Sequence, residues 1–396
     1  MSVPFWLDEP YEARPPLDGR LEVDACVIGA GVGGLSCALH LSGHGVDVAV
    51  LERATVASGA SGRNGGFLIA GAAPFHNDAR ELYGRERASR IYAATLEAQE
   101  EIIGLAGELG AGEIVRRVGL LRASASEEEA DHVREHAEML AEDGFPGELV
   151  ERGDLPPGVA YAHNAVFTPH DAALQPARWY RLLASAAERA GARIFEGTPV
   201  ECPVPAPGEG PLRTAGGAEV SARSVVVAAD GALPALVPDY AGRVRSRRLH
   251  MVATEPVAER LVEPLVYSRW GYEYWQQRPD GRILGGGFSD VDGETSYTDS
   301  DAGSDELWSR IESFIRDDIG AETRVTHRWA GVVGYSTDRL PSVGEVPGRP
   351  GLYVMGGYSG TGNVPGFMSG RDVADTIAGV NERKPLFGSD PGPGPG

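Results

Sequence analysis

The chain has 396 residues, enough for two domains, and its 42 % hydrophobic and 23 % charged content is ordinary for a globular protein. No apolar run approaches the roughly 18 residues of a membrane-spanning helix, and the N-terminus lacks an export signal, so we expect a cytoplasmic protein without integral membrane contact. The net charge of −21 argues against nucleic acid as a partner, because like charges repel.

Residues 24–52 carry glycines in G-x-G-x-x-G spacing between two short β-rich runs. Gly29 would make a tight turn, Gly31 would let the backbone approach a pyrophosphate, and Gly34 would let helix and strand pack closely. Glu52 ends the second run, where a carboxylate can accept both hydroxyls of a ribose and repel a 2′-phosphate. The stretch therefore predicts a bound adenine dinucleotide other than NADP.

The loop over residues 54–71 is dominated by small residues, with Arg63 and Asn64 in the middle. A loop so poor in side chains lets its backbone lie flat against a ligand. Arg63 is a candidate for binding that ligand or a substrate anion, and the alternative is a salt bridge within the loop.

Periodicity predicts one or two helices over residues 78–110 and single helices over 126–142, 176–190 and 304–318. Ser126 and Glu129 form a capping box, so we interpret the glutamates at 127–129 as a solvated first turn. His132 and His136 share a helix face, but no further ligand supports a metal site, and we expect none. Strands are predicted over 193–195, 198–201, 224–229 and 352–355, and across the β-rich segment 247–290.

A second glycine-rich turn, with Gly356, Gly357, Gly360 and Gly362, follows the strand at 352–355 and precedes a helix predicted over 368–377. This repeats the order of strand, glycine turn and helix. A second helix N-terminus is therefore expected to face the same ligand.

Several stretches resemble the flavin amine oxidase family named for D-amino acid oxidase (DAO), and together they cover about residues 20–380. Two are similar to its N-terminal flavin motifs, GAGVGGLSCALHLSGHGVDVAVLER and GASGRNGGF. The strand VVVAADG resembles the one near the adenine, and WAGVVGYSTDRLPSVGEV with GGYSGTGNVPG resembles the C-terminal motif. The sequences of these motifs are most similar to those of γ-glutamylputrescine oxidase and glycine oxidase-like members.

The resemblance implies an α/β fold with a Rossmann-like FAD-binding domain and a second α+β substrate domain built on an antiparallel sheet. The FAD-binding domain would be discontinuous, from residues 1–75, 155–235 and 325–385. The substrate domain would combine 76–154 and 236–324, and 386–396 would form a disordered tail.

The resemblance also implies FAD as the cofactor. Some members tether FAD through a cysteine or a histidine that this chain lacks at the matching positions, so we expect non-covalent binding. The residues expected to hold the cofactor are Gly29, Gly31, Gly33, Gly34, Glu52, Arg53, Ser61, Gly62, Arg63, Asn64, Gly65, Gly66, Val200, Gly231, Gly334, Gly357, Gly360, Thr361, Gly362 and Asn363.

The implied chemistry is hydride transfer from a C–H beside nitrogen to flavin N5, which gives an imine that hydrolyses and H2O2 from O2. The amine must lose its proton first, which an apolar pocket favours by penalising charge. Candidate pocket residues are Trp270, Tyr272, Tyr274, His250 and Tyr358. His250 is a candidate proton acceptor or positive charge, with a structural role as the alternative, and Arg269 and Arg328 are candidate carboxylate or phosphonate clamps.

Three functions stay open at this point. The first is an oxidase of a primary or secondary amine or amino acid. The second is a dehydrogenase of an amine or 2-hydroxy acid that passes electrons to a carrier, favoured because the one lysine, Lys384, lies close to the tail, whereas sarcosine oxidase-like members place a lysine over the flavin. The third is a non-catalytic flavin-binding subunit. The small-molecule substrate and the oligomeric state also stay open.

Overall fold

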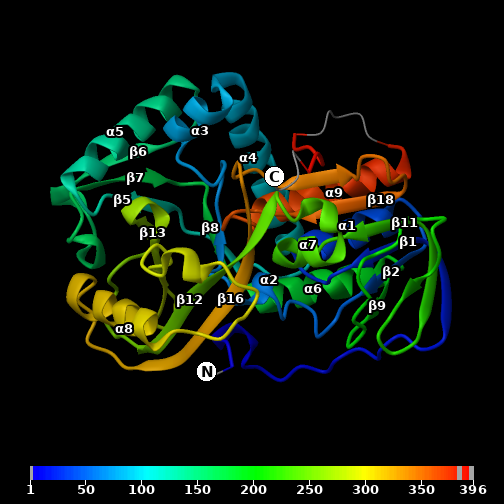
Figure 1. The fold of residues 1–396 in the computed structure, drawn as a ribbon. Helices are drawn as coiled ribbons and strands as arrows, with labels where there is room; N and C mark the ends of the chain where they lie inside the picture. The colour runs from blue at the N-terminus through cyan, green and yellow to red at the C-terminus, as the bar shows by residue number, and fades with distance from the viewer. Residues whose placement is uncertain (1–2, 381–385, 392–396) are drawn as a thin grey trace.

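The computed structural model describes residues 3–380 and 386–391, and Figure 1 shows its two large sheets side by side. The first is the nucleotide sheet, whose strand order is β17-β18-β11-β1-β2-β9, with β10 paired to β11. Its strands are β1 (Arg20–Ile28), β2 (Val48–Leu51), β9 (Arg193–Phe195), β10 (Leu212–Arg213), β11 (Glu219–Val227), β17 (Ser342–Glu345) and β18 (Leu352–Gly356). The neighbours from β18 to β9 are parallel, which confirms the predicted nucleotide-binding architecture.

Helices α1 (Val32–Gly43), α6 (Pro176–Arg189) and α9 (Asn363–Ala378) bury their apolar side chains against this sheet. The core between them is made of small and branched residues, including Ala25, Val27 and Leu35. Small side chains allow α1 and α9 to approach closely, since a Cβ on Gly370 would lie 2.4 Å from the Gly33 carbonyl oxygen. The two glycine-rich turns are thereby brought to one place.

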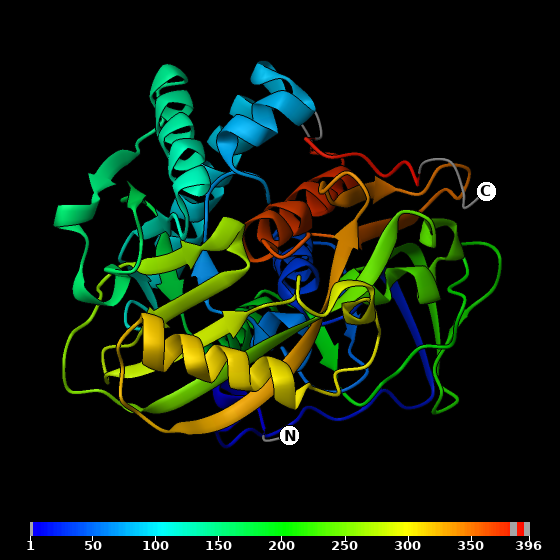
Figure 2. The ribbon, with the colours of Figure 1, turned by 60° about the vertical axis from the view of Figure 1, so that its left-hand side comes forward.

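The second sheet has the order β16-β12-β15-β14-β13-β5-β7-β6 and is antiparallel apart from the β13–β5 pair. Its strands are β5 (Leu120–Ala123), β6 (Glu148–Glu151), β7 (Asn164–Thr168), β12 (Val244–Pro256), β13 (Leu265–Ser268), β14 (Glu273–Gln277), β15 (Arg282–Gly287) and β16 (Val325–Ser336). Helix α8 (Asp305–Ser313) and the π-turn at 314–318 cover one face of it, as Figure 2 shows. The other face of this sheet lines the cavity described below.

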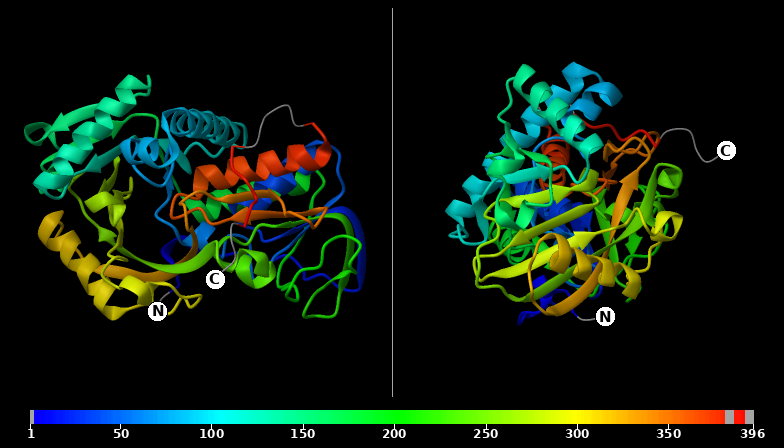
Figure 3. Two further views of the ribbon diagram at one scale, coloured as in Figure 1. Left: turned by 45° about the horizontal axis from the view of Figure 1, so that its top comes forward. Right: turned by 90° about the vertical axis from the view of Figure 1, so that its left-hand side faces the viewer.

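Helices α3 (His76–Tyr83), α4 (Arg85–Glu108) and α5 (Glu127–Glu142) gather on the side opposite α8 (Figure 3). Gly84, with φ of +81°, separates α3 from α4, so the segment predicted as one or two helices forms two. A small sheet of β3 (Phe67–Leu68), β8 (Ala172–Leu174) and β4 (Val115–Arg117) links this region to the first flavin loop. Two further α-helices, α2 (Ala60–Arg63) and α7 (Leu233–Leu236), are each four residues long.

Several segments differ from the sequence-based expectation. Helix α9 begins at Asn363 rather than 368, because a proline in the first turn costs no backbone hydrogen bond. Residues 198–201 contribute only an isolated bridge at Val200. Residues 386–391 are not a disordered tail, since Phe387 is buried and Gly388 accepts a hydrogen bond from Val343 N–H. Residues 392–396 lie outside the described residues.

The expected domain boundaries stay a prediction, and two strands cross them. β7 and β16 are hydrogen-bonded into the second sheet, although the sequence grouped 155–235 and 325–385 with the nucleotide domain. Among residues 3–380 and 386–391, no helix combines the length and apolarity needed to cross a membrane.

Candidate functional site

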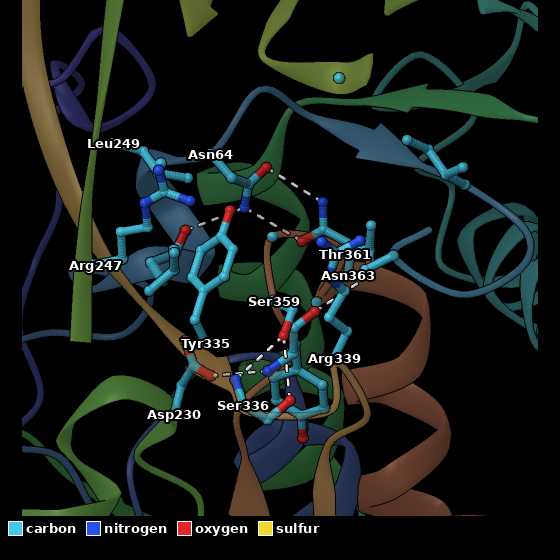
Figure 4. Close-up of a pocket in the computed structure, with 18 of the residues that line it drawn as sticks. Asn64, Asp230, Arg247, Leu249, Tyr335, Ser336, Arg339, Ser359, Thr361 and Asn363 are labelled. Carbon is cyan, nitrogen blue, oxygen red and sulfur yellow. Dashed lines mark hydrogen bonds between the residues drawn. The ribbon is translucent and has the colours of Figure 1, made fainter. Parts of the chain in front are cut away.

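A cavity of about 990 Å³ lies between the two sheets, and Figure 4 shows part of its wall. One side is formed by the fingerprint turn, the loop at 60–65 and the turn at 359–363. The other side is formed by β12, β13, β14 and the turn at 270–272. Motifs far apart in the sequence therefore enclose one space large enough for a cofactor and a small ligand.

The fingerprint turn has the geometry that its glycines predict. Gly29 has φ of +106°, and a Cβ on Gly34 would lie 1.9 Å from the carbonyl oxygen of Gly29. Helix α1 starts directly after Gly31, and Val32 and Gly33 of its first turn line the cavity, with the N–H of Val32 donating to Ser61 Oγ (2.9 Å).

Glu52 lies at the end of β2, beside the fingerprint turn. Its carboxylate accepts hydrogen bonds from the N–H groups of Ala30 (2.8 Å) and Ala54 (2.9 Å). Burial raises the pKa of Glu52, and these two hydrogen bonds oppose that rise. The acid is thus fixed at the position expected for a ribose partner, although it does not itself line the cavity.

The loop at 60–65 and the turn at 359–363 are joined by two hydrogen bonds between the side-chain amides of Asn64 and Asn363. Asn64 Nδ2 donates to Asn363 Oδ1, and Asn363 Nδ2 donates to Asn64 Oδ1, each over 3.2 Å. Asn363 also donates to the Phe67 carbonyl (2.9 Å) and accepts from the Tyr180 hydroxyl (2.7 Å). Figure 4 shows this pair opposite Arg247 and Leu249, with the ring of Tyr335 between them. The N-terminus of α9 is thereby held against the cavity.

Asp230 connects three further segments of the cavity wall. Its half-buried carboxylate accepts hydrogen bonds from the N–H groups of Gly334 (2.8 Å) and Gly357 (3.0 Å). Burial raises the pKa of Asp230, whereas the backbone N–H groups lower it. The sequence analysis named the neighbouring Gly231 but missed this acid, which joins Gly334 of β16 to Gly357 of the second glycine turn.

A row of side chains crosses the cavity face of the second sheet. Pairing places Met251 opposite Gly286, Gly286 opposite Tyr274, Tyr274 opposite Tyr267, and Tyr267 opposite Arg122. A Cβ on Gly286 would lie 2.5 Å from the Tyr274 ring, so glycine makes room for this ring. Burial raises the pKa of Tyr274, and that of Tyr267 to about 12, which keeps both hydroxyls protonated at neutral pH.

Trp270 and Tyr272 also line the cavity, but from a turn rather than a strand. Arg269 and Trp270 have φ of +49° and +53°, and Trp270 is 43 % exposed at the rim. Glu129 holds this turn by accepting a hydrogen bond from the Trp270 N–H (2.6 Å). The expectation of a solvated Glu129 is wrong, because tertiary packing buries it fully, whereas the Ser126 cap is confirmed.

Tyr358 belongs to the cofactor side of the cavity. A Cβ on Gly33 would lie 3.4 Å from its hydroxyl, and its ring packs against Gly362 and Gly366. Within the described part of the chain, this buried hydroxyl has no hydrogen-bond partner. The structure therefore places this candidate pocket residue on the cavity wall beside the fingerprint turn, across from the second sheet.

His250 does not reach the cavity. Strand alternation on β12 turns Leu249 and Met251 inward, so His250 faces outward against Trp308 of α8. Its Nε2 accepts a hydrogen bond from the Ser304 N–H (3.0 Å), and burial lowers its pKa to about 4. His250 is a structural histidine, and the expectation of a catalytic role is wrong for this reason.

The arginine candidates are distributed differently from expectation. Arg63 lines the cavity and pairs with Asp301 (2.9 Å), so its partner comes from outside its own loop. Arg269 pairs with Glu273 and Asp290, and Arg328 pairs with Glu312 at the surface. Neither Arg269 nor Arg328 lines the cavity, so neither is placed to clamp a substrate there.

Of the residues expected to hold the cofactor, those that line the cavity are Gly31, Gly33, Ser61, Arg63, Asn64, Gly65, Gly360, Thr361, Gly362 and Asn363. The others support the turns behind this wall or lie further away: Gly29, Gly34, Glu52, Arg53, Gly62, Gly66, Val200, Gly231, Gly334 and Gly357.

The sequence analysis missed two buried cavity arginines, Arg122 and Arg247. Arg247 donates to Ser296 Oγ (3.0 Å) and the Ser289 carbonyl (2.9 Å), and its guanidinium lies over the ring of Tyr335 (5.0 Å). Arg247 lies among other arginines in RSRRLH and gave no signal, whereas the available signal for Arg122 was a charged residue inside the otherwise apolar strand LLRA. Such a residue has to face a partner or a cavity.

The residues present fit an adenine dinucleotide that carries a flavin. Two helix N-termini open on the cavity behind glycine turns, and the buried Tyr358 hydroxyl is without a partner among the described residues. A Cβ on Gly31 would lie 2.9 Å from Ser61 Oγ, in the space between the fingerprint turn and the first flavin loop. Glycine at this position therefore lets the fingerprint turn approach the loop at 60–65 closely.

Comparison with known proteins agrees with this geometry. The chain is similar to the oxidoreductase OrdL of Rhizobium meliloti (strain 1021), with 29 % identity over 96 % of this chain and 90 % of that protein. It is also similar to gamma-glutamylputrescine oxidoreductase of Escherichia coli (strain K12), with 28 % identity over 96 % and 89 %. The structure of glycine oxidase from Geobacillus kaustophilus matches with a TM-score of 0.77 and 22 % identity, over 92 % of this chain and 97 % of that one.

The model of the DAO family, described as FAD dependent oxidoreductase, matches residues 24–376. This range includes both glycine turns, the loop at 54–71, Asp230 and the strands of the second sheet. From the sequence motifs, the fold and this match together, we conclude that the chain is an FAD-dependent oxidoreductase of the DAO family.

Proposed function

We propose that this protein oxidises the C–N bond of a primary or secondary amine or amino acid, with FAD held non-covalently and O2 as the final acceptor. The observation that carries the proposal is the close approach of Tyr274, on the second sheet, to the loop at 60–65. A Cβ on Gly65, beside Asn64, would lie 3.4 Å from the ring of Tyr274. A substrate beneath Tyr274 would therefore lie close to the loop that resembles the flavin-binding one.

The pocket residues suit an amine that reacts in its neutral form. The buried Phe67 and the half-buried Tyr267 and Tyr274 form an aromatic wall, with Phe67 stacked on Tyr267 (5.1 Å). Aromatic faces attract an arriving ammonium, and the buried site then favours the uncharged amine. No histidine or lysine is among the cavity-lining residues of the described chain, so we assign the loss of the amine proton to desolvation.

When bound, FAD supplies the two-electron acceptor for this oxidation. The N-terminal turns of α1 and α9, Ser61 and the Asn64–Asn363 pair are the groups that would hold it. Non-covalent binding is supported by the positions of the cysteines, since Cys26 and Cys37 are buried in the core and Cys202 does not line the cavity.

The second candidate is a dehydrogenase that passes electrons from an amine or a 2-hydroxy acid to a carrier. The observation that favours it is the absence of lysine from the cavity-lining residues that the structure describes. A lysine would supply a fixed positive charge beside the developing anion of reduced oxygen. Arg63 and Arg247 provide positive charge at the same cavity, which favours the oxidase.

The experiment that tests the proposal is flavin bleaching. The purified holoprotein is mixed without oxygen with amines, amino acids and 2-hydroxy acids, and the visible flavin band is followed, with free FAD as the control. Bleaching by an amine followed by rapid recovery in air supports the oxidase. Slow recovery in air supports the dehydrogenase, and a colour that no amine bleaches contradicts amine oxidation. Release of the flavin by acid precipitation checks that it is not tethered.

A further inference from the structure

The N-terminal arm, residues 3–19, reaches the loop at 60–65 from the side away from the cavity. Phe5–Leu7 form a short 3-10 helix, and its central residue, Trp6, is fully buried. The side chain of Trp6 belongs to one apolar cluster with Ala177 of α6 and Leu284 of β15. It therefore lies between a helix of the nucleotide sheet and the second sheet, and it does not line the cavity.

Polar contacts fix the arm at this place. Glu9 pairs with Arg178 of α6 (2.6 Å). Gln175, the residue before that helix, donates a hydrogen bond from its side-chain amide to the Trp6 carbonyl (3.4 Å). The arm is thus attached to α6 on both sides of the buried indole.

Three consecutive carbonyls of the loop at 60–65 each accept a hydrogen bond from a buried side chain of another part of the chain. The pairs, donor first, are Trp329 with Arg63 (2.8 Å), Trp6 with Asn64 (2.8 Å) and Gln276 with Gly65. The donors belong to β16, the N-terminal arm and β14. Since a buried carbonyl without a donor is costly, these side chains set the direction of each carbonyl.

The hydrogen bond from Trp6 also sets the direction of an N–H group. In a planar trans peptide, the carbonyl of one residue and the N–H of the next point in opposite directions. The Asn64 carbonyl is turned towards Trp6, so the N–H of Gly65 is turned away from it. Gly65 lines the cavity, whereas Trp6 lies behind the loop. The Gly65 N–H is therefore directed towards the cavity.

The position of Gly65 indicates which part of FAD it faces. Glu52 marks the adenosine end of a bound dinucleotide, and the fingerprint turn marks its pyrophosphate. Gly65 lies against the second sheet, since a Cβ on it would lie 3.4 Å from the ring of Tyr274. The redox-active ring is the part of the cofactor that remains for this end of the cavity.

We propose that Trp6 is a positioning residue for the flavin, because through the Asn64 carbonyl it holds the Gly65 N–H towards the flavin ring. Reduction adds two electrons to this ring, and a fixed N–H dipole favours the more electron-rich state. Trp6 therefore strengthens FAD binding and raises the reduction potential of the flavin. This inference goes beyond the proposed function, since it requires bound FAD but no particular substrate.

The test measures the dissociation constant of FAD and the midpoint potential of the full-length holoprotein, the latter by dye-coupled reduction without any amine. Trp6→Phe removes the indole N–H and keeps an aromatic ring. Reduced FAD should lose about 3- to 10-fold more affinity than oxidised FAD in this variant. At about 30 mV for each factor of ten in a two-electron couple, the potential should fall by about 15 to 30 mV.

Trp308→Phe is the matched control. Trp308 also donates from its indole to a backbone carbonyl, that of Trp329 (3.3 Å), but it belongs to α8 and does not line the cavity. This control should leave the potential unchanged. If Trp6→Phe does not fold or retain FAD, replacement of Trp6 by benzothienylalanine decides, because this residue keeps the shape of the indole and lacks its N–H.

An unchanged potential in the Trp6 variant, or an equal shift in Trp308→Phe, overturns the inference, because Trp6 then only packs the core. If the potential falls as expected but no amine bleaches the flavin, the positioning role stands and the proposed function fails. If amines bleach the flavin and the potential of the Trp6 variant is unchanged, the reverse holds.

Discussion

Asn64 and Asn363 are 299 positions apart in the chain, and each donates a hydrogen bond from its side-chain amide to the other. The first belongs to the loop after β2 and the second begins α9. The pair therefore sets the separation of the two segments that face the cofactor from opposite ends of the sequence.

Replacement of Asn363 by alanine is expected to lower both stability and FAD retention. The change removes the partner of Asn64, of the Tyr180 hydroxyl and of the Phe67 carbonyl at once. Buried polar groups left without partners cost about 1–3 kcal/mol, so the free energy of unfolding should fall by that order. Denaturant unfolding and the flavin-to-protein absorbance ratio measure the two effects. A variant with unchanged flavin content would contradict the assigned role.

Replacement of Asp230 by asparagine tests the connection between β16 and the second glycine turn. The amide has one acceptor oxygen in place of two, so either Gly334 or Gly357 loses its partner and faces an N–H2 group. We expect a loss of about 1–3 kcal/mol in unfolding free energy and weaker FAD binding. Thermal unfolding with and without added FAD measures both, and added FAD should restore part of the lost stability.

Replacement of Glu129 by alanine tests whether this buried acid positions the cavity rim. The change leaves the N–H groups of Trp270 and Ala125 without their acceptor, so the turn at 269–272 should loosen. We expect KM to rise more than kcat falls, because this turn lines the cavity on the side of the second sheet, across from the glycine turns. Glu128→Ala is the control, since Glu128 is exposed on the same helical turn. Equal effects from the two variants would refute the positioning role.

His250 should make stability depend on pH in a defined window. Burial lowers its pKa to about 4 in the folded protein, whereas an unfolded histidine titrates near about 6.5. Between these values the unfolded chain binds a proton that the folded chain does not. The stability is therefore full above about pH 6.5 and declines as the pH falls towards 4, by on the order of 2 kcal/mol at about pH 5.

The measurement is the difference in unfolding free energy between the parent and His250→Gln across this range. Other buried histidines titrate in both proteins and cancel in the difference. The advantage of the parent should shrink on acidification, while kcat should keep its pH profile because His250 lies outside the cavity. A shifted kcat profile would restore a catalytic role for this residue.

The sequence alone predicted the nucleotide sheet and the side of the cavity that the two glycine turns form. The two glycine turns are read locally, because Gly29, Gly34 and their flanking runs specify a strand, a turn and a helix within about 30 residues. The capping box at Ser126 was likewise local, since it depends on neighbours in the chain.

Only the tertiary structure decided which residues of the second sheet line the cavity. Alternation along β12 fixes that His250 and Met251 point to opposite sides, but it does not say which side meets the cavity, because that depends on where α8 packs. The burial of Glu129 and the burial of Arg122 have the same origin. Each depends on a segment more than 100 positions away, Trp270 for the first and Tyr267 for the second. Charge and burial are properties of the assembled surroundings, so no local pattern could assign them.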